Sequence, residues 1–247
     1  MTVFRPKLWT ASVAILLAAA ACSGEGGEAG EAGEAGPAAA VGEGGEGGAE
    51  GGAGAGEAGA QSAYTAIAPE SRVALRLAHL KGFLLAAQKL SDPAQASALV
   101  GQGVIEVYDA QPGAFQSVGL EAAALQKAAQ TGSAADINAA IQAVEAAQGK
   151  AQGDQAAVVK GLVNITAGLY RGVIAEGSVD PVEYQHAYGA ALAAQQVAAG
   201  ADDSKVEAAK GDIDKLVALF PAPEAPEQPT PVAQVSAQAS RIELALS

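Results

Sequence analysis

Apolar side chains recur every three to four residues from about residue 66 to residue 220, and this spacing limits the fold more than any other feature of the sequence. A period of 3.6 residues places such side chains on one face of an α-helix, whereas a half-buried strand requires alternation. The first segment shows the pattern in Val73, Leu77, Leu80, Leu84 and Ala87. Because little alternation competes with it, we expect an all-α protein.

Proline, glycine and capping residues mark where these helices begin and end. Asp92-Pro93 and Asp180-Pro181 are each typical of an N-cap followed by proline in the first turn, and Gly177 is typical of a helix end. The signals predict helices at 69–90, 93–100, 117–130, 134–148, 154–175, 181–199 and 203–219, with a helical turn at 104–108. We therefore expect an antiparallel bundle of about six helices over residues 62–220.

Two segments follow the expected bundle. Residues 221–231 contain five prolines and should form an extended linker. The tail, residues 232–247, is compatible with a docked strand, a weak helix or a free segment, and we expect it to be poorly ordered.

A low-complexity tract precedes the bundle. Residues 22–61 contain 16 Gly and eight Glu and no Lys or Arg, so they offer almost no apolar surface to offset the entropy of ordering. Glycine at nearly every third position resembles collagen spacing, but Pro37 is the only imino acid in the tract, and a collagen helix needs many. We expect a disordered Gly/Glu/Ala tether.

The first 21 residues have the layout of a secretory signal. Arg5 and Lys7 form a short cationic region, the segment 8–17 is mostly apolar, and a run of four alanines, 18–21, follows. The apolar segment is shorter than the roughly 20 residues that a membrane-spanning helix needs. We expect residues 1–21 to be a signal peptide rather than part of the fold.

Cys22 directly follows the alanine run, and the segment from Ala19 to Cys22 resembles the lipobox of bacterial lipoproteins. The resemblance implies a diacylglycerol on the Cys22 thiol, cleavage before this residue and, usually, acylation of the new amine. Ser23, where the enteric pattern places Asp for inner-membrane retention, implies the outer membrane. An ordinary cleaved signal with a chance Cys, or a retained anchor, remains the alternative.

Net charge and cysteine content exclude several classes of function. The formal charge of −13 argues against nucleic-acid binding, which needs clustered Lys and Arg, and against a basic patch for anionic lipids. A single Cys cannot form an intramolecular disulfide or a cysteine metal cage. A catalytic motif is also missing, since the sequence contains no Walker loop, nucleophile elbow or HExxH.

The two histidines are the strongest candidates for chemistry. Glu183 and His186 are three residues apart, the spacing by which helical dinuclear metal proteins direct both ligands inward. Glu183 also fits a structural role with Asp180 in capping its helix, and Tyr184 fits a core position. If the first and fifth long helices face each other, a mixed site for iron is conceivable from His79, Glu106, Tyr108, Glu183, Tyr184 and His186.

Two partial resemblances bear on the same residues. The stretch from Leu169 to Tyr184 resembles a helix–turn–helix signature of periplasmic helical domains in iron-permease-type proteins. The first two helices resemble proteobacterial lipoproteins with a Gly/Glu tether, in which Gly-His-Leu is joined by further histidines. Here Ala78-His79-Leu80 stands instead, and Leu99 and Gln102 lie where those histidines are expected, so the resemblance implies a depleted metal site.

These observations predict a lipid-anchored protein of the bacterial envelope that presents a helical, non-catalytic binding or accessory domain. It would attach to the membrane through its N-terminal lipid, on the periplasmic face of the outer membrane or at the cell surface, and act on an unidentified envelope partner. The alternative is periplasmic metal handling, with iron held by His79 and His186.

Overall fold

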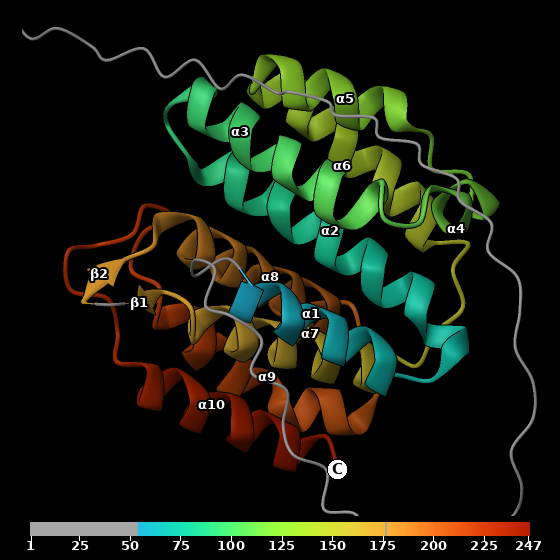
Figure 1. Ribbon diagram of the computed structural model, residues 1–247. Helices are drawn as coiled ribbons and strands as arrows, with labels where there is room; N and C mark the ends of the chain where they lie inside the picture. The colour runs from blue at the N-terminus through green and yellow to red at the C-terminus, as the bar shows by residue number, and fades with distance from the viewer. Residues whose placement is uncertain (1–53, 176) are drawn as a thin grey trace, which may run out of the picture. The chain divides into compact units, whose positions relative to one another are not determined.

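The computed structural model describes residues 54–175 and 177–247. The expected signal peptide (1–21), the lipidation site Cys22 and the tether as far as residue 53 lie outside the described residues. Most of the described chain is helical, and Figure 1 shows its helices packed in two groups. The expectation of an all-α helical bundle is confirmed.

The first group lies in the N-terminal half of the described chain. Its members are α2 (Arg72–Lys89), α3 (Pro93–Gly103), α4 (Pro112–Ser117), α5 (Ala122–Thr131) and α6 (Ala134–Gln148). A short 3-10 helix, η1 (Pro69–Ser71), precedes α2, and a π-helical turn, η2 (Val104–Tyr108), continues α3. In this group α2 packs on α3 and α6, and α5 also packs on α3 and α6.

The second group contains the remaining helices. They are α1 (Gly54–Ala66), α7 (Gln155–Tyr170), α8 (Pro181–Ala199), α9 (Ser204–Ala218) and α10 (Val232–Ala245). Helix α7 packs on α1, α8 and α10, and α9 lies against α8 and α10. The two groups meet where α2 packs on α8.

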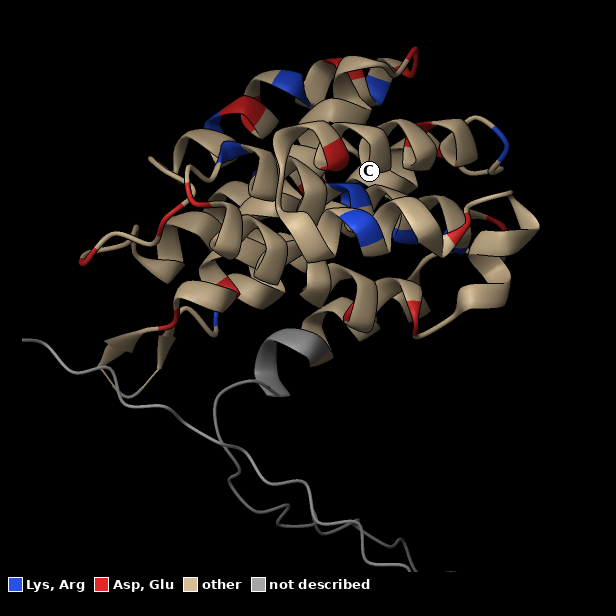
Figure 2. Ribbon diagram, turned by 90° about the horizontal axis from the view of Figure 1, so that it is seen from above, with Lys and Arg blue, Asp and Glu red and all other residues tan. Residues whose placement is uncertain are grey.

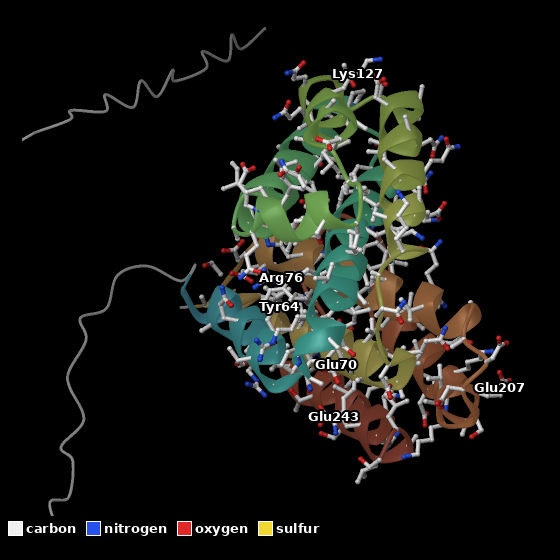
Figure 3. All side chains as sticks on the ribbon, turned by 90° about the vertical axis from the view of Figure 1, so that its right-hand side faces the viewer. Tyr64, Glu70, Arg76, Lys127, Glu207 and Glu243 are labelled. Carbon is white, nitrogen blue, oxygen red and sulfur yellow. The ribbon has the colours of Figure 1, made fainter. Side chains whose placement is uncertain are left out.

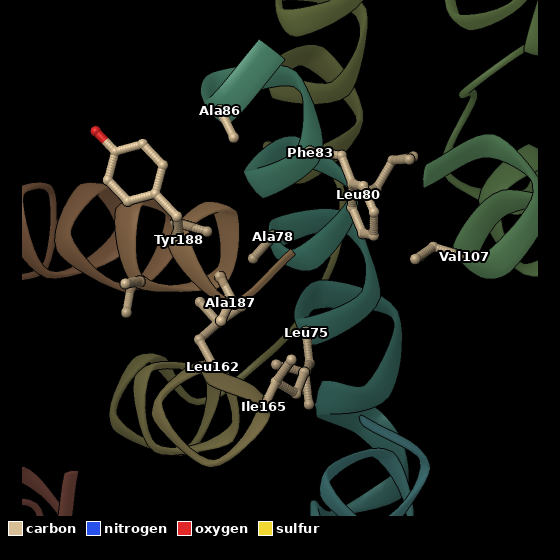
Figure 4. Packing of buried hydrophobic residues seen from close by; sticks show 14 of the residues in the cluster. Leu75, Ala78, Leu80, Phe83, Ala86, Val107, Leu162, Ile165, Ala187 and Tyr188 are labelled. Atoms are coloured by element: carbon tan, nitrogen blue, oxygen red, sulfur yellow. The ribbon is translucent and has the colours of Figure 1, made fainter. Parts of the chain in front are cut away.

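Helix α2 supplies the centre of the core. Twelve of its residues are buried, because neighbours cover it on several sides. Figure 4 shows Leu75 directed toward Ile165 of α7, while Phe83 and Leu80 lie on the side of η2. A helix buried all round needs apolar residues beyond a single stripe, and α2 has them.

Side-chain caps explain where many of these helices begin. Five of the described helices start at a residue whose oxygen accepts from a backbone N–H in the first turn: Asp92, Ser133, Asp154, Asp180 and Asp203. Such caps satisfy N–H groups that have no partner within the helix. The starts of α3 and α8 therefore fall where the sequence predicts them.

The number of helices is higher than expected. The described residues contain ten α-helices rather than about six, because the expected segments omit the short α4 and the two terminal helices. The expected helix at 154–175 also ends earlier, at Tyr170. A two-residue antiparallel hairpin, β1 (Ile174–Ala175) and β2 (Ser178–Val179), follows it, and Gly177 in its turn has a φ of 81°. Gly177 therefore occupies a hairpin turn, where its positive φ is needed, and does not end a helix as the sequence predicts.

The expectation that the tether extends to residue 61 is wrong for its last residues, which belong to α1. Ala60, Ala63 and Tyr64 are buried, and Gly59 lies so close to Gly168 of α7 that a Cβ on Gly59 would be 2.9 Å from the Gly168 Cα. Helix α1 is thus held by tertiary packing, since its own sequence is poor in large apolar residues.

The expectation of a poorly ordered tail is also wrong. Residues 232–245 form α10, whose Val235 and Ile242 are fully buried. The Gln238 Nε2 donates to the Asp212 carbonyl of α9 at 2.8 Å. The proline-rich segment 221–231 contains no regular helix or strand, as expected, and it is held by Tyr184 and Tyr170, whose hydroxyls donate to the carbonyls of Ala222 and Thr230.

None of the helices in the described part of the chain is both long enough and apolar enough to cross a membrane. Figure 2 shows the Lys and Arg residues dispersed over several helices rather than gathered on one.

Candidate functional site: a pocket at two buried histidines

The two histidines are brought together by a close crossing of α2 and α8. A Cβ built on Gly82 of α2 would lie 2.5 Å from the Gly189 carbonyl oxygen, and one on Gly189 would lie 2.7 Å from the Gly82 oxygen. Only glycine permits two helices to approach in this way. His79 and His186 each lie three residues before the glycine of their own helix, so both flank this contact.

Phe83 contacts both imidazoles. Its ring centroid lies 5.2 Å from that of His79 and 4.7 Å from that of His186, in tilted arrangements. Gly103 of α3 makes room for the ring, because a Cβ there would lie 2.7 Å from the Phe83 Cγ. The two histidines and Phe83 thus form one packed aromatic cluster.

His79 has one satisfied and one unsatisfied nitrogen. The Tyr64 hydroxyl from α1 lies 2.5 Å from His79 Nδ1, whereas the Nε2 atom is buried without a hydrogen-bond partner. The guanidinium of Arg76 lies 4.0 Å from the centre of the Tyr64 ring, as a cation–π contact, and Figure 3 shows these two residues adjacent.

His186 has polar neighbours on both sides of its ring. Its Nε2 lies 2.9 Å from the Oε1 of Gln102, and its Nδ1 lies 3.7 Å from a carboxylate oxygen of Glu106. Glu106 belongs to the π-helical turn η2. Such turns are frequent at functional sites, because an extra residue in one turn redirects neighbouring side chains.

Burial keeps both imidazoles neutral at physiological pH. It lowers the pKa of His79 to about 3, with further contributions from His186 and Arg76. It lowers the pKa of His186 to about 4, although Asp180 acts in the opposite direction. The approach of His186 to Glu106 is therefore not an ion pair at neutral pH. Burial also raises the pKa of Tyr64, so its hydroxyl keeps its proton.

A pocket of about 250 Å³ opens beside these groups. We call it the histidine pocket, and it is lined by Ala60, Gln61, Tyr64, His79, Phe83, Ile105, Glu106, Val107, Leu169 and His186. The walls are mostly aliphatic and aromatic, and Ile105 has 69% of its surface exposed. An apolar pocket with a few convergent polar groups is the usual form of a small-molecule site.

The structure places the expected site residues in two different regions. His79, His186 and Glu106 line the histidine pocket, as a facing pair of helices allows. Tyr184 instead packs on Phe220 and Tyr170 beside the proline-rich segment. It does not line the pocket.

Tyr108 and Glu183 also lie elsewhere. Tyr108 stacks on Phe115, and its hydroxyl donates to the Leu120 carbonyl at 3.3 Å. Glu183 is buried at the third position of α8, with its side chain beside Gly172. The cap itself comes from Asp180, whose Oδ1 accepts from the backbone N–H groups of Val182 and Glu183.

Metal binding was the alternative expectation for these residues. Among the described residues, no three His, Cys, Asp or Glu side chains are grouped as ligands of one metal ion. The iron site expected from six residues is therefore not assembled, because Tyr184 and Tyr108 contact other parts of the core.

Several pocket residues were not identified from the sequence. Tyr64 and Phe83 contact the histidines, yet neither stands out by spacing. One sequence feature could have pointed to Tyr64: it is the first aromatic residue after Trp9, at the end of a long tract that contains no aromatic residue. An aromatic residue at that boundary indicates that packing has begun.

Comparisons with protein-family models, with curated proteins and with solved structures give no match to this chain. The site is therefore interpreted from its own geometry.

Proposed function

We propose that this protein is a bacterial envelope lipoprotein, anchored through Cys22 in the outer membrane, whose helical domain binds a small molecule in the histidine pocket without catalysing a reaction. The sequence from Ala19 to Cys22 supports the anchor, and Ser23 supports the outer membrane, on its periplasmic face or at the cell surface. The histidine pocket supports the binding role.

The observation that carries the binding role is the histidine pocket itself, a hollow of about 250 Å³ in which mostly apolar side chains are joined by two imidazoles, a phenol and a carboxylate. Small-molecule sites commonly combine apolar walls with a few polar groups that fix the orientation of the ligand.

The protonation states of the histidines favour binding over catalysis. A general base is most effective when its pKa lies near the working pH. The pKa values of His79 and His186, about 3 and about 4, make both imidazoles weak bases at neutral pH. We therefore assign them to recognition.

Metal handling is a second candidate, because His79, His186 and Glu106 line one pocket. Imidazole and carboxylate are ligands that iron accepts. This candidate requires side chains to move, since the described residues contain no ready group of three ligands.

The anchor is tested by mass spectrometry of the protein isolated from membranes. We expect an N-terminal peptide that begins at Cys22 and carries fatty acyl groups, and we expect Cys22→Ser to abolish both cleavage and membrane retention. An unmodified thiol at this position would contradict the anchor.

The binding role is tested on the same preparation by analysing what denaturation releases. We expect an organic compound in near-stoichiometric amount from the wild type and from Tyr108→Phe, a matched buried phenol outside the pocket, but far less from His79→Phe. Iron or zinc at one equivalent, lost in both His79→Ala and His186→Ala, would favour metal handling. Release of neither a compound nor a metal would contradict both candidates.

A further inference from the structure

Helix α1 contributes little to the core of the domain. Its 13 residues include three glycines, and glycine is among the weakest helix formers. Of its described side chains, Ala60, Ala63 and Tyr64 are buried, so Tyr64 is the one large group among them. Helix α10, with 14 residues, buries Val235 and Ile242 completely. Apolar burial therefore holds α1 less firmly than α10.

Two polar groups of α2 are buried against Tyr64 without full compensation. Arg76 has 6% of its surface exposed, its guanidinium lies 4.0 Å from the centre of the Tyr64 ring, and its Nη1 has no hydrogen-bond partner among the described residues. His79 Nε2 is likewise buried and unpartnered, while Nδ1 of the same ring contacts the Tyr64 hydroxyl. The cation–π contact and the hydrogen bond offset only part of the cost of removing these groups from water. The docking of α1 therefore carries a desolvation penalty.

We infer that α1 is a detachable cover over one side of the histidine pocket: it opens while the other helices stay folded, and it opens because its docking leaves Arg76 and His79 unsatisfied. Elements with few buried apolar contacts commonly open in this local way. The inference goes beyond the proposed binding function, since the opening needs no ligand.

Opening of α1 changes what the histidine pocket presents to solvent. Helix α1 supplies Ala60, Gln61 and Tyr64 to the pocket, and their departure gives water access to groups that the docked helix seals. The groups then facing the opening are the guanidinium and the imidazole of α2 and the carboxylate of Glu106 from η2. The docked state thus hides polar groups that the open state displays.

Hydrogen–deuterium exchange followed by mass spectrometry tests the opening. The protein is the full chain with Cys22→Ser, so that no lipid is attached, and peptides from α1 are compared with peptides from α10. We expect amides of α1 to exchange at least about 100-fold faster than those of α10, yet at least about tenfold more slowly than an unstructured peptide, because the opening is local and reversible.

Arg76→Met tests the cause of the opening, since it removes the unsatisfied guanidinium and keeps an unbranched side chain. We expect this variant to slow the exchange of α1 relative to α10 by about tenfold, because replacing a poorly compensated buried charge by an apolar group commonly stabilises the docked state. Arg72→Met is the matched control. It makes the same change in charge on the same helix, but Arg72 is exposed, so the ratio should stay within about twofold of the wild type.

A thiol placed under α1 gives a second measurement, which does not require Arg76→Met to fold. Cys22 is the sole cysteine of the chain, so Cys22→Ser leaves no other thiol. Ala63 of α1 and Ala239 of α10 are 4% and 2% exposed. In native buffer, we expect the thiol of Ala63→Cys to react with a thiol-specific reagent at least about tenfold faster than that of Ala239→Cys.

The outcomes separate this inference from the proposed function. Equal protection of α1 and α10, or equal thiol reactivity, would overturn the detachable cover. Exchange of α1 at the rate of an unstructured peptide would overturn it as well, since α1 would then never cover the pocket. Unchanged or faster exchange of α1 in Arg76→Met would overturn the assigned cause. Release of a compound on denaturation is measured independently, so the proposed binding function stands or falls by itself.

Discussion

At the scale of single residues, Gly82 and Gly189 decide how closely the two helix groups approach. A side chain on either would meet backbone atoms of the other helix within 3 Å, and backbone cannot rotate away. We expect Gly82→Ala to destabilise the fold by about 3 kcal/mol or more, the upper part of the usual range for overpacking. Urea denaturation followed by circular dichroism measures the change.

Gly101 provides the matched control. It lies inside α3, and a Cβ there meets nothing within 4 Å. We expect Gly101→Ala to stabilise the protein by up to about 1 kcal/mol through helix propensity alone. Equal effects of the two substitutions would show that the close crossing does not exist.

The Tyr64 hydroxyl lies 2.5 Å from His79 Nδ1, and because a neutral phenol is a stronger donor than a neutral imidazole, we expect His79 to carry its hydrogen on Nε2. We expect Tyr64→Phe to lower the stability by roughly 1–2 kcal/mol and to remove the preference for the Nε2–H tautomer, because Nδ1 loses its donor. The ¹⁵N chemical shifts of the imidazole report the tautomer. Tyr108→Phe should leave these shifts unchanged, and a Tyr64→Phe spectrum identical to the wild type would contradict the assigned hydrogen bond.

At the scale of helices, α10 shows that a weakly amphipathic segment can be an integral part of the core. We expect Ile242→Ala to cost about 2–4 kcal/mol, since the side chain is fully buried. Leu244, two residues away, is 77% exposed, so Leu244→Ala should change the stability by less than about 0.5 kcal/mol. Thermal unfolding of both variants measures the difference, and similar values would mean that α10 does not dock as described.

Helix starts could be predicted from sequence where a local signal exists. Asp92-Pro93 and Asp180-Pro181 mark the starts of α3 and α8 in the sequence, because an N-cap and the fixed φ of proline act within a few residues. Helix α10 begins without such a side-chain cap, and the sequence before α1 offers no comparable signal. Their order comes from contacts with α7 and α9, which no local pattern records.

The histidine pocket was predictable only in part for the same reason. Helical periodicity indicated which faces of α2 and α8 are buried, and the facing of these helices brings His79 and His186 together. The position of the Tyr184 side chain depends on where the proline-rich segment docks. The position of the Tyr64 side chain beside His79 depends on α1 forming a helix that packs on the fold. Both are consequences of long-range packing.

At the scale of the whole molecule, the buried histidines make the stability depend on pH. Their pKa values in the folded protein, about 3 and about 4, lie below the unfolded value of 6.5, so the unfolded chain binds protons that the folded chain does not. The full stability is therefore present above about pH 6.5 and is lost as the pH falls toward 4 and below. We expect a loss of roughly 2 kcal/mol per histidine at pH 5.

Urea denaturation at pH 7 and pH 5 tests this expectation. His79→Gln and His186→Gln should each reduce the difference between the two pH values. Asp136 is the control, since its hydrogen bond with Lys127 and those with Thr131 and Ser133 lower its pKa to about 2, and its contribution is lost only below the ordinary carboxylate pKa of 3.8. Asp136→Asn should leave the difference between pH 7 and pH 5 unchanged, and a wild type equally stable at both values would contradict neutral, buried histidines.

Helix α1 forms one wall of the histidine pocket and is also where the described chain continues from its N-terminal segment. Under the proposed binding function, a ligand held against Tyr64 and Ala60 would fasten α1 to the rest of the fold, and detaching α1 would remove that wall. Because linkage is reciprocal, tension that peels α1 away would then weaken ligand affinity by the same factor by which occupancy resists the peeling. The proposed site would thereby couple mechanical load at the N-terminal end of the domain to ligand occupancy.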